Sequence, residues 1–335
     1  MSKPAFAIIE CERPRKLCHD CHFVEFLSDS KTVVGFLGGR FDTPSLISQW
    51  DAESGKHLKA ADSIPYSSTW DCWTSPDSRL IAISQSKTVL ANPDFDKTGE
   101  RVRYNTIGNT YIVDTGTLKI RATLSYPISQ AAFSGDGELM AVVDADKTIR
   151  IIKLKSNKEL ASRKVDGYVP ALAFQPDPAE LWIVEKDVVQ SWNHRTDIVR
   201  ESAKASGSNH AFSPDGKNLL YHGGTYKAFT PVVTDTTSWK SKKIGYFGKV
   251  RHLSLSPDAS KLAIAAENTL VVWNLVEDCA WLKWKKPHYD NIRHAAFSPD
   301  GQRVACILNG GQVQIFDFRE GAKDQLLYRF HCLHL

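Results

Sequence analysis

The hexapeptide Ala-Phe-Ser-Pro-Asp-Gly occurs twice in this chain, at residues 211–216 and 296–301, and it constrains the fold more than any other feature. Each copy lies between two short apolar stretches. In such a turn Pro presets φ at the first corner, Asp accepts hydrogen bonds from the backbone that follows, and Gly adopts a positive φ. The motif therefore predicts a tight hairpin between two β-strands.

Five looser copies share the register of these two. The aligned aspartates are Asp29, Asp77, Asp136, Asp177, Asp215, Asp258 and Asp300. Successive aspartates are 48, 59, 41, 38, 43 and 42 residues apart, which is the spacing of four-stranded propeller blades. The apolar stretches that follow the hairpins, such as residues 262–266, are too short and too regularly interrupted to be helices.

These repeats predict an all-β fold, a seven-bladed β-propeller with four antiparallel strands per blade. Residues 22–331 would form the propeller, and residues 1–21 an N-terminal segment that supplies an edge or closing strand. The expected blades span about residues 22–60, 69–122, 128–164, 170–202, 208–244, 250–285 and 292–331. The outer strand of the last blade could come from residues 6–9 or from residues 326–330. The C-terminal stretch is favoured because it continues blade seven at a natural spacing.

Several third strands end in Trp-Asp or a close variant of it. These ends are Gln49-Trp50-Asp51, Ser191-Trp192-Asn193, Val272-Trp273-Asn274 and Ile315-Phe316-Asp317, and the turn into a third strand is clearest at residues 146–151. The chain thereby resembles the WD-repeat family over residues from about 22 to 331, although the Gly-His pair that opens many family repeats is missing. The resemblance implies a scaffold that binds a protein or peptide partner. The usual binding face carries the loops between second and third strands and the loops between blades.

On that face blade two would carry an insertion, residues 85–108, which accounts for the widest separation between aspartates. A long loop in a compact domain is more often functional than idle, although a solvated hairpin extension without function is the alternative. Aromatic and Arg side chains on exposed loops suit interface hot spots. The predicted partner-binding residues are Arg40, Phe41, Tyr66, Lys97, Arg101, Arg103, Tyr104, Tyr168, Tyr226, Lys227, Tyr246, Phe247 and Tyr289. Tyr246 and Phe247 could equally fill gaps between blades.

Motifs for catalysis are absent from the sequence: there is no Gly-x-Ser-x-Gly elbow, no His-Glu-x-x-His helix and no Gly-rich phosphate loop. We therefore expect no catalytic residue, no metal and no cofactor. The alternative is a propeller enzyme of the hydrolase or lactonase type that uses the central channel. His210, His252 and His294 stand 5, 6 and 6 residues before their aligned aspartates, and this recurrence favours a structural role.

The segment Cys18-His19-Asp20-Cys21-His22 matches the pattern for covalent haem attachment. It runs straight into the first expected strand and no export signal precedes it, so we interpret the match as coincidence. Seven cysteines without the density of a disulfide scaffold indicate reduced thiols and a cytoplasmic or nuclear location.

The charge and hydropathy of the chain limit its partners further. The net charge of +4 is mild, and the lysines at 240, 242, 243, 283, 285 and 286 are expected on outer strands, where lysines protect sheet edges. Nucleic acid is therefore disfavoured as a partner. A membrane-spanning helix needs roughly 18 to 20 apolar residues, and no stretch of this sequence approaches that length.

Overall fold

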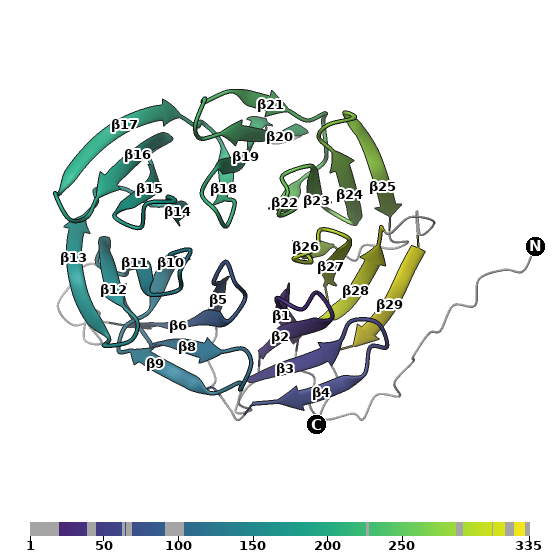
Figure 1. Cartoon of the computed structure of the whole chain (residues 1–335), viewed down its shortest axis with the longest axis horizontal. Coiled ribbons are helices and arrows are strands. Elements are labelled where there is room, and N and C mark those ends of the chain that lie inside the picture. The colour runs from purple at the N-terminus through teal and green to yellow at the C-terminus, as the bar shows by residue number, and fades with distance from the viewer. Residues whose placement is uncertain are drawn as a thin grey trace, which may run out of the picture. The chain divides into compact units, whose positions relative to one another are not determined.

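The computed structural model describes residues 20–38, 45–61, 64, 69–90, 104–225, 228–285, 291–309, 311–318 and 325–331. These residues form strands and turns, and none of them belongs to a helix that could cross a membrane. The strands make seven antiparallel sheets, each built from consecutive strands of the chain (Figure 1). We call these sheets blades one to seven in chain order. The chain divides into two compact units, residues 67–204 and residues 1–66 with 205–335.

The unit of residues 67–204 contains three blades. Blade two has β5 (Thr69–Thr74), β6 (Leu80–Leu90), β7 (Tyr104–Ile107), β8 (Thr110–Asp114) and β9 (Ile120–Leu124). Blade three has β10 (Ile128–Phe133), β11 (Leu139–Asp144), β12 (Thr148–Lys153) and β13 (Lys158–Lys164). Blade four has β14 (Ala171–Phe174), β15 (Glu180–Glu185), β16 (Val188–Asn193) and β17 (Ile198–Lys204).

The other unit contains four blades. Blade one has β1 (Asp20–Phe26), β2 (Thr32–Gly38), β3 (Leu46–Asp51) and β4 (His57–Ala60). Blade five has β18 (Ser208–Phe212), β19 (Asn218–Thr225), β20 (Ala228–Asp235) and β21 (Ser241–Lys243). Blade six has β22 (Val250–Leu255), β23 (Lys261–Ala266), β24 (Thr269–Asn274) and β25 (Cys279–Lys285). Blade seven has β26 (Ile292–Phe297), β27 (Arg303–Leu308), β28 (Gln312–Asp317) and β29 (Gln325–His331).

The fold is thus the predicted all-β, seven-bladed β-propeller. The C-terminal strand β29 pairs with β28, with Val313 opposite Phe330, and it is the fourth strand of blade seven as expected. Residues 1–19, which include the other candidate closing strand, lie outside the described residues.

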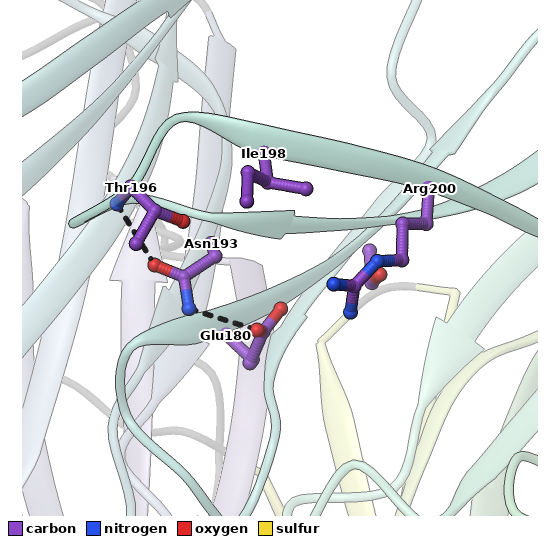
Figure 2. Close-up of a pocket in the computed structure, with 6 residues that line it drawn as sticks. Glu180, Asn193, Thr196, Ile198 and Arg200 are labelled. Atoms are coloured by element: carbon purple, nitrogen blue, oxygen red, sulfur yellow. Dashed lines mark hydrogen bonds between the residues drawn. The ribbon is translucent and has the colours of Figure 1, made fainter.

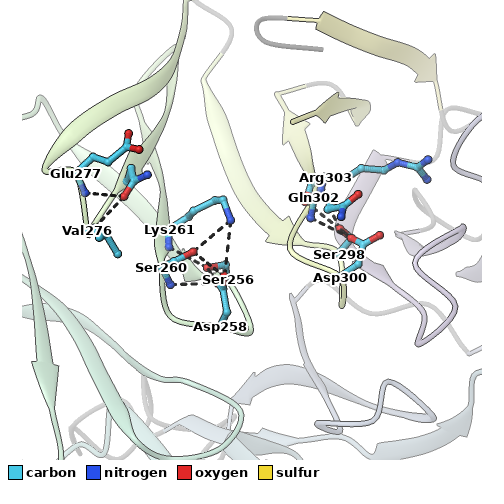
Figure 3. Close-up of polar contacts among 11 residues, drawn as sticks. Ser256, Asp258, Ser260, Lys261, Val276, Glu277, Ser298, Asp300, Gln302 and Arg303 are labelled. Atoms are coloured by element: carbon cyan, nitrogen blue, oxygen red, sulfur yellow. Dashed lines mark hydrogen bonds and ion pairs between the residues drawn. The ribbon is translucent and has the colours of Figure 1, made fainter. Parts of the chain in front are cut away.

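A serine closes the repeated hairpin. In blade seven, Ser298 Oγ donates to Asp300 Oδ1 at 2.5 Å and accepts the backbone N–H of Arg303 at 2.9 Å (Figure 3). Asp300 Oδ1 also accepts the N–H of Gln302 at 3.0 Å. The same arrangement occurs at Ser75–Asp77, Ser134–Asp136, Ser213–Asp215 and Ser256–Asp258. The hairpin motif recurs because its serine and aspartate together satisfy backbone donors that the turn leaves open.

The acidic or amide residue that ends a third strand caps the turn after it. Asn274 Oδ1 accepts the N–H groups of Val276 at 2.8 Å and Glu277 at 2.9 Å (Figure 3). Equivalent caps are formed by Asp51, Asp114, Asn193 and Asp235. The Trp-Asp signature is therefore a strand end followed by a side-chain-capped turn.

Within each unit the apolar core lies between neighbouring blades. Ile149 and Ile151 of blade three pack with Leu181 and Trp192 of blade four in one buried cluster. Blade one joins blade seven through a similar cluster, which contains residues 24 and 33 of blade one and residues 307 and 315 of blade seven. In these clusters the second and third strands bury their apolar side chains toward the neighbouring blade.

Candidate functional site

Tyr168 is an exposed aromatic side chain on a short loop between blades. It lies between β13 and β14, and 70% of its surface is accessible. The sequence predicted a partner-binding role for it. An aromatic ring this exposed contributes little to the core, so its surface is available for contact with another molecule.

The loop that carries Tyr168 is held by a carboxylate from the next blade. Glu185 Oε1 accepts the N–H of Asp166 at 2.9 Å and the N–H of Gly167 at 2.7 Å. Glu185 ends β15, where a two-residue turn with positive φ at Lys186 and Asp187 leads into β16. A Cβ atom on Gly167 would lie 3.0 Å from Lys186 Cγ, so glycine allows the close approach. The backbone beneath Tyr168 is fixed by these contacts.

The second unit presents Tyr246 on the corresponding loop, between β21 and β22, with 82% of its surface accessible. The adjacent Phe247 anchors this loop, because its backbone exchanges two hydrogen bonds with Phe229, at 3.1 and 3.0 Å. The ring of Phe247 also meets Trp273 edge to face, with 6.4 Å between centroids. Phe247 thus packs between blades five and six, and Tyr246 projects from a fixed backbone.

Most other predicted binding residues lie outside the described residues. They are Arg40, Phe41, Tyr66, Lys97, Arg101, Arg103, Tyr226, Lys227 and Tyr289. Tyr104 begins β7, where the structure describes the backbone.

The insertion of blade two starts as a β-ribbon. Strand β6 pairs with β8 over residues 80–84 and then continues to Leu90, where it pairs with β7. The register joins Lys87 to Ile107 and Leu90 to Tyr104. A Cβ atom on Gly108 would collide with the carbonyl oxygen of Gln85, so the ribbon leaves the blade at a point that requires glycine. The described part of the insertion is therefore an ordered extension of the sheet, and residues 91–103 lie outside the described residues.

The inner strands carry the ionisable groups that matter for the enzyme alternative. Burial raises the pKa of Glu25, on β1, to about 8. Burial lowers the pKa of His252 to about 4 and places that of His294 well below its usual range. His210 is held inside blade five, with Nε2 2.7 Å from the carbonyl oxygen of Ala205. Among the described residues, no three His, Cys, Asp or Glu side chains are grouped so that they could hold a metal ion.

Two other sequence features have structural partners. Cys21, the second cysteine of the haem-like segment, is buried and its thiol donates to the carbonyl oxygen of Phe23 at 3.1 Å. Cys18 and His19 lie outside the described residues.

Among the lysines expected on outer strands, Lys242 has partners in the next blade. Its Nζ lies 2.9 Å from Asp278 Oδ1 and donates to the carbonyl oxygen of Leu275 at 2.7 Å. Lys242 therefore links blades five and six.

A small polar cavity on blade four was not predicted from the sequence. It has a volume of about 180 Å³ and is lined by Glu180, Ser191, Asn193, Thr196, Ile198 and Arg200 (Figure 2). The signal in the sequence is the replacement of an arginine by a serine at one aligned position. Arg150 of blade three and Ser191 of blade four both stand 14 residues after their hairpin aspartates.

Comparison with known proteins supports the fold. Residues 118–153, which contain β10, β11 and β12, match the family model described as WD domain, G-beta repeat. No curated protein matches the sequence. Among solved structures, the chain is similar to the β-propeller domain of Cps50 (Swd1) from Myceliophteria thermophila. The TM-score is 0.63 and the sequence identity 10%, over 89% of this chain and 96% of that chain, so this likeness shows the fold alone.

Proposed function

We propose that this chain, a WD-repeat β-propeller protein, is a non-catalytic scaffold that binds a protein or peptide partner through its interblade loops. The observation that carries the proposal is Tyr168, an exposed ring on a backbone that Glu185 holds with two hydrogen bonds. A fixed backbone lowers the entropy lost when the ring is buried in a partner, which is the property of an interface hot spot. Tyr246 would supply the same function in the second unit.

The ribbon of β6 and β7 is the second part of the proposed surface. Because β6 pairs with both β8 and β7, the insertion leaves blade two in a defined direction. The remaining predicted residues of the insertion, Lys97, Arg101, Arg103 and Tyr104, would add charged and aromatic contacts. A protein that works this way, with reduced thiols, is proposed to act in the cytoplasm or nucleus.

The proposal is tested by affinity purification of the tagged protein from its own cells, with partners quantified by mass spectrometry. We expect Tyr168→Ala combined with Tyr246→Ala to deplete a specific set of partners at least about tenfold, since each hot spot contributes about 2 kcal/mol or more. The matched control is Leu160→Ala with Leu58→Ala, which removes exposed apolar side chains from fourth strands of the two units. Equal depletion by both pairs would contradict the proposal.

Removal of residues 88–106 tests the insertion separately. We expect this deletion to reduce partner recovery while thermal unfolding remains cooperative, because blade two keeps its pairing of β6 with β8. Unchanged partners after the deletion would exclude the insertion from the binding surface.

The alternative function is a propeller enzyme of the hydrolase or lactonase type. The observation that favours it is Glu25, since a carboxyl group whose pKa is raised to about 8 can serve as a general acid at neutral pH. Hydrolysis of a panel of esters and lactones, measured for the wild type and Glu25→Gln, decides between the functions. Turnover that Glu25→Gln abolishes would support the enzyme and reject the scaffold as the primary role.

A further inference from the structure

The cavity on blade four is formed on one face of its sheet. The register places Ser191 opposite Arg200, and Asn193 opposite both Glu180 and Ile198. The opposite face carries Leu181, Ile183 and Trp192, which pack against blade three. Alternation along the strands therefore directs the lining side chains away from that core, and Figure 2 shows Glu180, Asn193, Ile198 and Arg200 around the same space.

Asn193 holds one side of the cavity in place. Its Nδ2 donates to Glu180 Oε1 at 2.8 Å, and its Oδ1 accepts the N–H groups of Arg195 and Thr196, both at 3.0 Å (Figure 2). The amide oxygen thus caps the turn while one N–H of the amide fixes the carboxylate of Glu180 at the wall. Within the described part of the chain, the second oxygen of Glu180 accepts no hydrogen bond, so it can accept one from a ligand.

Arg200 supplies the positive charge of the cavity. Within the described residues no carboxylate forms an ion pair with its guanidinium group. The hydroxyl of Ser191 lies on the neighbouring strand at the directly opposed position. A guanidinium beside a hydroxyl is a donor set that suits a carboxylate, because arginine can donate two parallel N–H groups to its two oxygens.

Blade three shows what the same sheet positions look like when they are satisfied. There Arg150, on β12, stands opposite Ser162, on β13, so the arginine and the serine of blade four have exchanged strands. Arg150 Nε lies 2.8 Å from Asp144 Oδ2, and Nη1 lies 2.7 Å from Glu159 Oε2. In blade three, carboxylates of the same blade pair with the arginine. Among the described residues, no carboxylate pairs with the arginine of blade four.

We infer that this cavity binds the acidic side chain of an extended peptide in a partner protein. The carboxylate is taken by Arg200 and the hydroxyl of Ser191, its methylene groups lie on Ile198, and a backbone N–H of the peptide donates to Glu180. A volume of about 180 Å³ admits one side chain and is below the several hundred Å³ typical of cofactor and substrate pockets. The inference rests on the proposed partner-binding function and adds the chemistry of the partner.

Titration of blocked peptides tests the inference directly. The probes are the pentapeptide acetyl-Ala-Ala-Asp-Ala-Ala-amide, its Asn counterpart and free acetate, and the readout is the Nε–H resonance of Arg200 in the full-length, deuterated protein. We expect a saturable shift with the Asp peptide, and binding at least about tenfold weaker for both the Asn peptide and acetate. Acetate binding as tight as the Asp peptide would overturn the peptide assignment and leave a plain anion site. Absence of a saturable shift with the Asp peptide would overturn the inference.

Variants connect the resonance to the cavity. Arg200→Met should abolish binding of the Asp peptide, measured by calorimetry, whereas Arg195→Met removes the same charge from the adjacent turn and should leave binding unchanged. Equal losses in the two variants would indicate a general charge effect and contradict the inference. Tyr168→Ala should not alter binding of this peptide. The scaffold proposal fails if partners are still recovered from the variant without Tyr168 and Tyr246. The cavity inference fails if Arg200→Met still binds the Asp peptide, so the two failures are distinguishable.

Discussion

His252 and His294 lie on the neighbouring inner strands β22 and β26 with their ring centroids 4.1 Å apart. His252 Nδ1 accepts the N–H of Ala295 at 3.4 Å, and His294 packs against Phe23 of blade one, with 5.5 Å between ring centroids. The two imidazoles therefore lie within the packing that joins blades six, seven and one. Both are neutral at physiological pH, because burial lowers the pKa of each ring.

The histidine pair predicts acid sensitivity. In the unfolded chain both rings take up protons near pH 6.5, whereas in the folded protein the pKa of His252 is about 4 and that of His294 lies well below its ordinary value. The unfolded state thus binds more protons, and the free energy of unfolding falls as pH drops from about 6.5 towards 4. His294→Phe keeps an aromatic ring beside Phe23 and should lose less stability over this window, measured by denaturant unfolding. Parallel pH profiles for the two proteins would contradict the prediction.

Glu25 predicts the opposite pH dependence. Its carboxyl group has a pKa of about 8 in the folded protein and an ordinary value of 4.5. The folded state therefore retains a proton that the unfolded chain releases, and stability falls as pH rises from about 4.5 to 8. We expect Glu25→Gln to melt at a higher temperature than the wild type at pH 8 and to show no gain at pH 4. A gain of equal size at both pH values would assign the effect to packing.

Ala259 predicts a stabilising substitution. It has φ 55° at the hairpin position where blades five and seven carry Gly216 and Gly301. A left-handed conformation costs a residue with a Cβ about 1 to 2 kcal/mol. Glycine avoids this cost but loses about 0.5 to 1 kcal/mol more in chain entropy on folding, which offsets part of the gain. Ala259→Gly should therefore raise the free energy of unfolding by about 0.5 kcal/mol.

The matched control for Ala259 is Gly301→Ala. A Cβ atom at Gly301 would lie 3.7 Å from Pro257 Cδ, an ordinary contact, so any loss of stability comes from the backbone conformation. We expect a loss of about 0.5 kcal/mol or more in urea unfolding. Similar effects of the same sign in both variants would reject this account of the hairpin.

Gln314 predicts a second stabilising change. It lies on β28, fully buried, and neither Oε1 nor Nε2 has a hydrogen-bond partner within the described part of the structure. An unsatisfied buried polar group costs about 1 to 3 kcal/mol, so Gln314→Leu should stabilise the protein by about 1 kcal/mol or more. Gln130→Leu is the control, because Gln130 accepts from Trp73 Nε1 and donates to the carbonyl oxygen of Pro170. That variant should be destabilised.

The blades could be predicted from the sequence because their hairpins are closed by local chemistry. Ser298 and Asp300 bond to each other and to backbone groups within five residues, so the pattern repeats in the sequence wherever the turn repeats in space. The fourth strand of blade seven was predicted because it follows β28 after a short loop, as the fourth strand follows the third in the other blades.

Features that depend on side-chain direction across several strands were harder to predict. His210, His252 and His294 look like one series in the sequence, yet His210 stands one residue closer to its aspartate and bonds to Ala205, in the loop that precedes its own blade. The cavity around Arg200 was missed because its lining comes from three strands and a turn, and the pairings of Ser191 with Arg200 and of Asn193 with Glu180 bring these side chains together only in the folded sheet. The register between strands is not readable from a single sequence.

The strand order within each sheet has a consequence for how the protein is made. Every described blade is formed by consecutive strands, and blade one is completed by β1 to β4 without any strand from the C-terminal region. During translation the first blade can therefore pair all of its strands as soon as they leave the ribosome, and each later blade can likewise pair its own strands. Ribosome-bound nascent chains in which residues 1–164 have all emerged from the ribosome should already protect the amides of β10 to β12 from hydrogen exchange.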